Sequence, residues 1–162
     1  MTAEPEALPL LTLADVYEPL TAPFPLEYVE IKPGAISRDS DRALALAYVD
    51  ARLYMQRLDD VVGPDNWQVC YRPWGPAAVI CRLQVLGVIR EDVGEADEKD
   101  QNRITIAVAQ SFKRACAAFG LGRYLYHVPQ IWADYDREKK VIKTPSAVVQ
   151  RMYTALGIGH PR

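Results

Sequence analysis

The stretch Ala107–Gly122, AVAQSFKRACAAFGLG, decides the fold predicted for this chain. On a helical wheel its apolar side chains gather on one side, which predicts a helix that packs against a core. Gly120 and Gly122 follow the last apolar position, as expected of a glycine-rich helix end that a hydrophobic contact closes. The predicted core side comprises Ile104, Val108, Phe112, Ala115, Cys116 and Phe119.

The opposite side of this helix carries a row of cations. Arg103 and Arg114 share that side about 16 Å apart, at ~1.5 Å of rise per residue, and Lys113 lies on its flank. From residue 101 to residue 133 the chain has four Lys or Arg residues and no Asp or Glu. An isolated cationic pair would indicate only a solvated helix face, whereas a cation row without carboxylate partners favours a polyanionic ligand.

Composition and charge limit the possible functions. The 162 residues, 49% of them hydrophobic and 25% charged, predict one soluble domain that can bury its own core. The net charge of −2 means that a nucleic-acid interface must be a local patch. Cys70, Cys81 and Cys116 lie in apolar runs without a C-x-x-C spacing, which predicts reduced core thiols and a cytoplasmic location. In agreement, no signal peptide or membrane span is predicted.

The first part of the chain is acidic, since residues 1–30 contain six acids and no base. We expect an acidic segment with a short helix at 1–26, followed by the main folded domain at 27–162. Thr12 is predicted to cap the short helix, and the prolines that follow are expected to stop it. Residues 1–9 are predicted to form a frayed tail.

The middle of the chain predicts short strands around one well-defined helix. Apolar residues at helical spacing predict a helix at 48–62, ended by Gly63-Pro64. The β-rich run 77–90 predicts a hairpin that turns at Leu86-Gly87. Residues 43–47 fit either a helix start or a short strand. The other predicted elements are strands at 28–31 and 67–72, a turn at 32–34, a loop at 73–76, a solvated turn with six carboxylates at 91–100, a hairpin at 132–142 and a last helix from Pro145 to Leu156 capped by Thr144.

Several motifs of the chain occur in a familiar order. The sequence KRA at 113–115 is followed by Phe119-Gly120 and preceded by Ala107-Val108, and EDVG stands at 91–94. Further upstream lie Tyr48, Gly63 and Trp67. Over residues 27–126 the chain thereby resembles the Rad52 family of single-strand annealing proteins. By this resemblance, residues 27–162 are expected to form a single-strand DNA-binding domain of the annealing type.

The resemblance implies an α+β fold in which a small antiparallel sheet packs on the long helix as a β-β-β-α core. It also implies an oligomeric ring of identical subunits that holds single-stranded DNA in a positively charged groove, with Lys113 and Arg114 matching the DNA-contacting pair. The chain has Ala117 and Leu86 where eukaryotic members carry further cations, so strand binding is expected to be retained better than strand pairing. The predicted DNA-binding residues, including arginines that could replace the missing charge, are Lys113, Arg114, Arg103, Arg82, Arg123 and Arg52.

The function predicted from the sequence is a single-stranded DNA-binding protein of DNA repair, associated with the nucleoid. By the resemblance, it is expected to coat strands and protect their 3′ ends from nucleases. Annealing of complementary strands is the first alternative. The second alternative is an assembly or scaffold protein whose basic stripe pairs with the acidic N-terminal segment of a neighbouring copy.

Motifs for catalysis are weak in this sequence. It has no GxxxxGK[ST] loop, and His127 and His160 do not stand at ligand spacing from another His or Cys. Asp134 followed by Glu138-Lys139-Lys140 is faintly similar to the acid-x-lysine pattern of metal-dependent nucleases, which a charged turn also produces. The sequence therefore predicts no enzyme, no cofactor, no metal and no nucleotide.

Aromatic side chains often assist the binding of single strands by stacking on bases. Trp74, in its Pro-Gly loop, is the exposed aromatic residue that the sequence predicts for this role. Trp67 and Trp132 are predicted to belong to the core.

Overall fold

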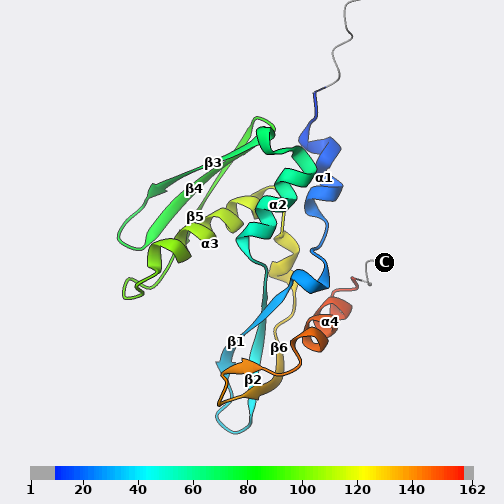
Figure 1. Cartoon of the computed structure of the whole chain (residues 1–162), viewed down its shortest axis with the longest axis vertical. Helices are drawn as coiled ribbons and strands as arrows, with labels where there is room; N and C mark the ends of the chain where they lie inside the picture. Colours follow the sequence, from blue (N-terminus) through cyan, green and yellow to red (C-terminus); the bar gives the residue numbers. More distant parts are fainter. Residues whose placement is uncertain (1–9, 159–162) are drawn as a thin grey trace, which may run out of the picture.

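Helix α3 (Arg103–Ala118) lies across an antiparallel sheet of order β3-β4-β5, formed by Trp67–Pro73, Ala78–Val85 and Val88–Glu95. Helix and sheet make the upper of two lobes in this computed structural model, which describes residues 10–158 (Figure 1). The predicted tail at 1–9 and His160 lie outside the described residues. This arrangement is the β-β-β-α core that the family resemblance implied.

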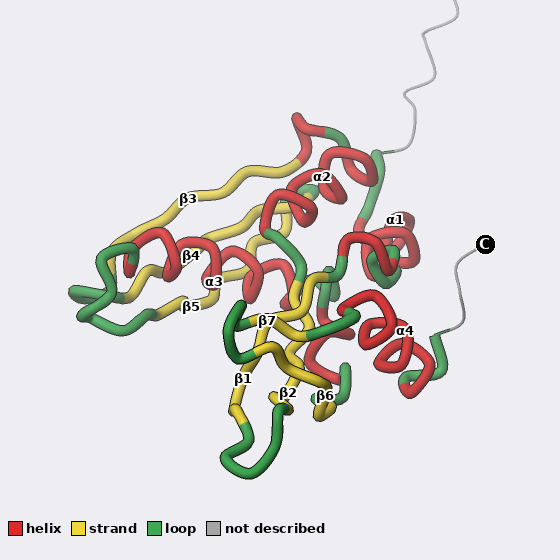
Figure 2. Tube along the Cα trace, turned by 60° about the horizontal axis from the view of Figure 1, so that its bottom comes forward, coloured by secondary structure: helices red, strands yellow, loops and turns green. Residues whose placement is uncertain are grey.

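The lower lobe is a second antiparallel sheet of order β1-β2-β6-β7 with one helix (Figure 2). Its strands are β1 (Glu30–Ile36), β2 (Arg42–Tyr48), β6 (Ile131–Asp136) and β7 (Val141–Ile142), and its helix is α4 (Pro145–Ala155). Strand β2 pairs with β6 across about 90 residues of chain, from Arg42 opposite Asp134 to Ala45 opposite Ile131. The sequence predicted a strand at 28–31 and a hairpin at 132–142 and left residues 43–47 open, and it did not predict that these segments form one sheet.

Shorter helices join the two lobes. Helix α1 (Leu13–Thr21) and helix α2 (Ala51–Val62) pack on each other, and α2 also contacts α3. The Thr12 amide and hydroxyl both donate hydrogen bonds to the Asp15 carboxylate, which confirms Thr12 as the start of α1. Between residues 10 and 158 there are also three short 3-10 turns, η1 (Leu26–Tyr28), η2 (Pro64–Asn66) and η3 (Arg123–His127).

Alternation of apolar and polar residues positions β4 against α3. Four alternate residues of β4 are buried toward the helix, where Phe112 is 1% exposed and packs against Trp67. The predicted hairpin turn is confirmed, because Leu86 and Gly87 both take positive φ values there. The four buried residues of β4 are Val79, Cys81, Leu83 and Val85.

Strand β5 approaches α3 so closely at Gly94 that the two backbones touch. A Cβ atom at Gly94 would lie 2.2 Å from the Ala107 carbonyl oxygen and 2.4 Å from the Ser111 nitrogen. Only glycine therefore fits at this position of the EDVG motif, and the contact fixes where α3 lies on the sheet.

The C-terminal end of α3 confirms the predicted glycine cap. Gly120 takes φ +92°, and the Leu121 amide donates to the Cys116 carbonyl at 3.1 Å while the Gly120 amide donates to Ala117 at 2.9 Å. These two bonds form a Schellman motif, and the buried Leu121 side chain supplies its hydrophobic contact.

Several predicted boundaries were wrong. The chain does not turn at 32–34, because β1 continues to Ile36 through a bulge. For residues 43–47, where a helix start and a short strand were both open, the strand alternative is confirmed, since they lie in β2. The helix predicted from residue 48 begins at Ala51, since Tyr48 still pairs with Glu30 in the sheet. The predicted acidic turn was wrong in its first half, because residues 91–95 belong to β5 and pair with β4.

Three predicted core residues are exposed. Ile104 is 48% exposed because the first turn of α3 lies at the outer end of the lobe, where no second layer covers that side (Figure 1). Cys70 and Trp132 were also predicted to be buried. Both point outward from alternate positions of their strands, Cys70 opposite Arg82 and Trp132 opposite Leu44. Within residues 10–158, no helix is both long and apolar enough to cross a membrane.

We expect Gly94→Ala to destabilise the fold by about 3 kcal/mol or more, because backbone atoms on both elements would have to move apart. The matched control is Gly34→Ala, whose Cβ would meet the tip of the Leu46 side chain at 3.0 Å, and we expect a change within about 1 kcal/mol. Urea unfolding followed by circular dichroism measures both values. Equal stabilities for the two variants would contradict this account of the strand–helix contact.

Candidate nucleic-acid interface

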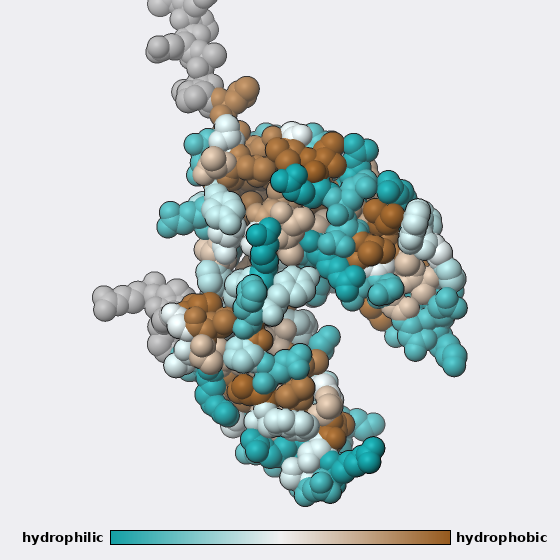
Figure 3. All heavy atoms as spheres, turned by 180° about the vertical axis from the view of Figure 1, so that it is seen from behind, coloured by the Kyte–Doolittle hydropathy of each residue, from teal (hydrophilic) through white to brown (hydrophobic). Residues whose placement is uncertain are grey.

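The two lobes meet at a hollow of about 280 Å³ beside the C-terminal half of α3. Figure 3 shows the concave notch between the lobes from behind. Among the described residues that line the hollow, two are cations and none is an acid. The lining residues are Ala47, Tyr48, Val49, Tyr54, Gln110, Lys113, Arg114, Gly122, Leu125 and Tyr126.

Lys113 reaches from α3 toward the end of β2. Its Nζ donates to the Val49 carbonyl at 3.4 Å, and the side chain is half-buried. Burial lowers the pKa of Lys113, and the nearby Lys32 lowers it further, while Asp50 acts in the opposite direction. Lys32, on a strand of the lower lobe, is therefore close enough to disfavour the charged form of Lys113.

Arg114 is held against the sheet by a single hydrogen bond. One terminal nitrogen donates to the Val93 carbonyl at 2.9 Å. Within residues 10–158 this is the guanidinium's one hydrogen bond, although the group carries five N–H donors. The adjacent Gln110 accepts from the Glu95 amide at 2.7 Å, so the residues on both sides of Gly94 position polar side chains of α3.

Two tyrosines flank the cations. Tyr126, at the end of η3, is 66% exposed. Tyr48 lies at the end of β2, where the Lys32 ammonium is 5.5 Å from its ring centroid. The Tyr48 hydroxyl donates to the Glu30 carboxylate, and this bond, with burial, raises the pKa of Tyr48. The Glu30 carboxylate beside Tyr48 therefore already accepts a hydrogen bond from a neutral donor.

The structure separates the other predicted cations from this hollow. Arg103 donates to the Pro76 carbonyl at 3.1 Å and the Asp100 carbonyl at 3.4 Å, at the far end of α3. Arg123 donates to the Ala117 and Ala118 carbonyls at 2.8 and 3.1 Å and closes the last turn of α3. Both side chains thus have structural partners on α3 or the loop before it.

The two remaining predicted cations are exposed. Arg82 is on the face of β4 opposite to α3, because Cys81 and Leu83 on either side point into the core. Arg52 lies in the first turn of α2, two residues after Asp50, which influences Lys113. Arg52 is therefore near the hollow without lining it, whereas Arg82 lies on another surface.

Sequence reasoning missed Lys32 and Tyr126. Lys32 was assigned to a Lys-Pro-Gly turn, so its place on a strand beside Tyr48 could not be foreseen. Tyr126 follows the glycine cap of α3, and its spacing from Tyr124 in a Tyr-Leu-Tyr sequence was the available signal. Trp74 is also 66% exposed, as predicted, but it does not line the hollow.

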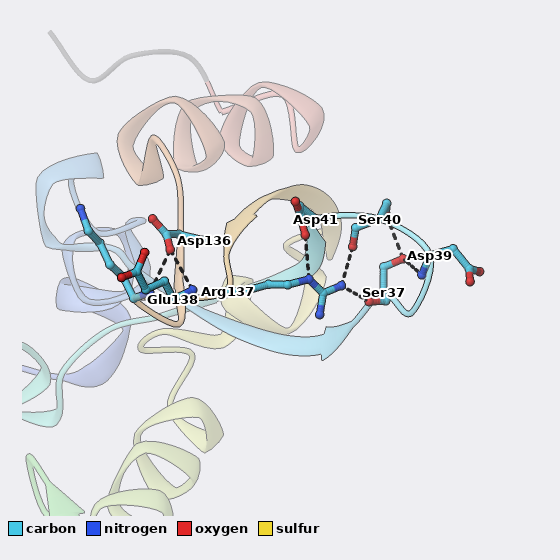
Figure 4. A network of polar contacts seen from close by, with 8 residues as sticks. Ser37, Asp39, Ser40, Asp41, Asp136, Arg137 and Glu138 are labelled. Carbon is cyan, nitrogen blue, oxygen red and sulfur yellow. Dashed lines mark hydrogen bonds and ion pairs between the residues drawn. The ribbon is translucent and has the colours of Figure 1, made fainter.

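A second polar cluster lies at the tip of the lower lobe (Figure 4). Arg137 donates to the Asp41 carboxylate at 2.7 Å and to the Ser37 and Ser40 carbonyls at 2.7 and 2.8 Å. These three bonds tie the β6–β7 turn to the β1–β2 turn. No three His, Cys, Asp or Glu side chains of the described residues gather as a metal site.

The upper lobe is an α+β unit with a β-β-β-α core, and comparison with known proteins identifies the family to which the chain belongs. The model of the Rad52/22 family of double-strand break repair proteins matches residues 12–143. The chain therefore belongs to the Rad52/22 family.

Two relatives are similar over most of this chain, and both are called single-stranded DNA-binding protein DdrA. The protein from Deinococcus radiodurans is 44% identical over 133 residues, which cover 80% of this chain and 64% of the relative. The protein from Deinococcus deserti is 43% identical over 138 residues, which cover 83% of this chain and 68% of the relative. The matched region thus spans about two thirds of each relative's length.

We expect the pKa of Lys113 to lie below the 10.5 of an ordinary lysine, because burial and Lys32 both disfavour its charged form. Lys32→Gln removes the like charge and should raise this pKa toward the ordinary value. Side-chain NMR titration with ¹⁵N-labelled lysine measures both values. If the pKa of Lys113 is the same in the wild type and in Lys32→Gln, the two ammonium groups do not interact electrostatically.

Proposed function

We propose that this chain binds single-stranded DNA in the hollow between its lobes. The observation that carries the proposal is the pair Lys113 and Arg114, half-buried in a hollow whose lining contains no acid. Membership of the Rad52/22 family and the name shared by both relatives support a DNA strand as the anion. The chain would act by occupying the strand, without bond chemistry, cofactor or metal.

The chemistry of the hollow suits a flexible single strand. Cations that neutralise phosphates release counterions, so the affinity should be independent of sequence and strongly dependent on salt. Tyr126 and Tyr48 offer aromatic rings beside these cations, and such rings stack on bases that a duplex keeps inside. A single strand can therefore use both kinds of interaction, whereas a duplex can use only the first.

We also propose that several copies act together as a ring. One chain brings only a few cations to the hollow, and linking many copies raises the effective concentration at each next site along a strand. Strands β3 and β5 are both edges of the upper sheet, and an edge strand can pair with another chain. A ring of identical subunits would give one continuous track for the strand.

Lys113→Gln with Arg114→Gln should weaken binding to a dT oligonucleotide by tenfold or more. It should also reduce the slope of log affinity against log salt by about 0.7 for each phosphate that is no longer neutralised. Fluorescence anisotropy at several salt concentrations measures both. The matched control is Arg82→Gln, an exposed cation on the other face of the sheet, which should bind like the wild type.

Two results of this experiment would contradict the proposal. Equally weakened binding in Arg82→Gln and in the double variant would show that the hollow is not the DNA site. A wild type that binds no DNA would favour the scaffold alternative. Light scattering on the same samples tests the ring, because a single 18.2 kDa particle without DNA excludes it.

We further propose that the bound strand is protected rather than paired. The two positions where eukaryotic members of the family carry further cations hold apolar residues here, since Ala117 is buried and Leu86 packs against the core. A second strand would thus find fewer charges than the first. The chain is therefore expected to hold one strand well and a complementary strand poorly.

Tailed duplexes test this division of roles. We expect saturating protein to slow digestion of a 3′ overhang by a 3′ exonuclease, with little acceleration of annealing between complementary oligonucleotides. Duplexes with a 5′ overhang and a 5′ exonuclease provide the matched comparison for end preference. Rapid digestion of the 3′ overhang would contradict the protective role, and fast annealing beside poor protection would establish the annealing alternative.

A further inference from the structure

Tyr54 of α2 belongs to the hydrophobic core and also lines the hollow between the lobes. The residue is 4% exposed, and the centroid of its ring lies 5.1 Å from that of Phe24. This packing fixes the direction in which the side chain points. The hydroxyl at its tip lies beside Gly122, where a Cβ atom would come within 2.5 Å of the hydroxyl oxygen. The absence of a side chain at position 122 therefore leaves room for this hydroxyl.

The Tyr54 hydroxyl has no hydrogen-bond partner within residues 10–158, unlike two other tyrosine hydroxyls of the same core. Tyr124 and Tyr153 bond to each other at 2.6 Å, and Tyr153 also donates to the Phe24 carbonyl at 2.8 Å. Every side-chain polar atom that the described part of the fold shuts off from solvent has such a partner. The Tyr54 hydroxyl must therefore open onto the hollow that the residue lines, and its partner must come from outside the chain.

The polar groups around this hydroxyl offer donors. Burial raises the pKa of Tyr54, so its hydroxyl keeps its proton at neutral pH. Lys113 and Arg114 each donate one hydrogen bond to a backbone carbonyl and carry further N–H groups. Gln110 accepts from the Glu95 amide with its side-chain oxygen, which leaves its N–H groups for a ligand. A ligand group that consists only of acceptors suits this set, and a phosphate is such a group.

We infer that the Tyr54 hydroxyl donates a hydrogen bond to a phosphate oxygen of the bound strand and fixes that phosphate beside Lys113 and Arg114. This inference rests on the proposed function and adds to it a neutral donor from α2. The charge of a cation attracts a phosphate from any direction, whereas a hydroxyl on a packed ring bonds within a narrow range of angles. Tyr54 therefore determines where in the hollow the phosphate lies.

Tyr54→Phe tests the inference, because it removes one oxygen and keeps the packed ring. In anisotropy titrations we expect this variant to bind a dT oligonucleotide about fivefold or more weakly than the wild type. The slope of log affinity against log salt should stay unchanged, because no charge is removed. The midpoint of urea unfolding should not fall, because the hydroxyl has no partner in the described fold.

Tyr153→Phe is the matched control. Its hydroxyl belongs to the same core, is bonded to Tyr124 and Phe24, and does not line the hollow. We expect this variant to lower the midpoint of urea unfolding and to bind dT like the wild type. The two variants should thus have opposite effects on stability and on affinity.

An oligonucleotide of equal length made of abasic sites separates a phosphate contact from a base contact. Its phosphates are the same as those of dT, and its bases are missing. We therefore expect Tyr54→Phe to weaken binding of the abasic strand by the same factor as binding of dT.

Three results would overturn the inference. If Tyr54→Phe binds dT like the wild type, the hydroxyl takes no part in binding. If its unfolding midpoint falls as far as that of Tyr153→Phe, the hydroxyl has a structural role. If the loss on dT is absent on the abasic strand, the hydroxyl contacts a base. A wild type that binds neither oligonucleotide would instead reject the proposed function itself.

Discussion

At Gly94 the backbone of β5 lies against the backbone of α3 with no space for a side chain. The residues on either side of Gly94 form backbone hydrogen bonds with side chains of α3. The Val93 carbonyl accepts from Arg114, and the Glu95 amide donates to Gln110. The EDVG motif and the KRA motif are therefore two sides of one contact. Because this contact sets the position of α3 on the sheet, it also decides which side chains of α3 face the lower lobe.

The hollow forms where the end of β2, in the lower lobe, lies beside this side of α3. Strand β2 ends at Tyr48, and the carbonyl of Val49 then accepts from Lys113. Lys113 is thereby drawn out of bulk water, and burial together with Lys32 lowers its pKa. An anion placed there would relieve the repulsion between the two ammonium groups.

Local patterns predicted the upper lobe well and the site only in part. Strict alternation in β4 and the glycine cap of α3 are short-range signals, and both were confirmed. The lower sheet depends on pairing between β2 and β6, which no local pattern encodes. For that reason Trp132 was predicted to be buried and Lys32 was placed in a turn. The role of Arg123 was equally hidden, because its hydrogen bonds to the end of α3 depend on the path of the chain after Gly122.

The central claim is that DNA lies in the hollow between the lobes, and photo-crosslinking tests it most directly. A dT oligonucleotide that carries 5-iodo-deoxyuridine would be irradiated with the wild-type chain, and the crosslinked peptides identified by mass spectrometry. We expect crosslinks to Tyr126 and Tyr48, which flank the cations of the hollow. Crosslinks confined to the outer face of β3 and β4, around Cys70 and Arg82, would contradict the claim.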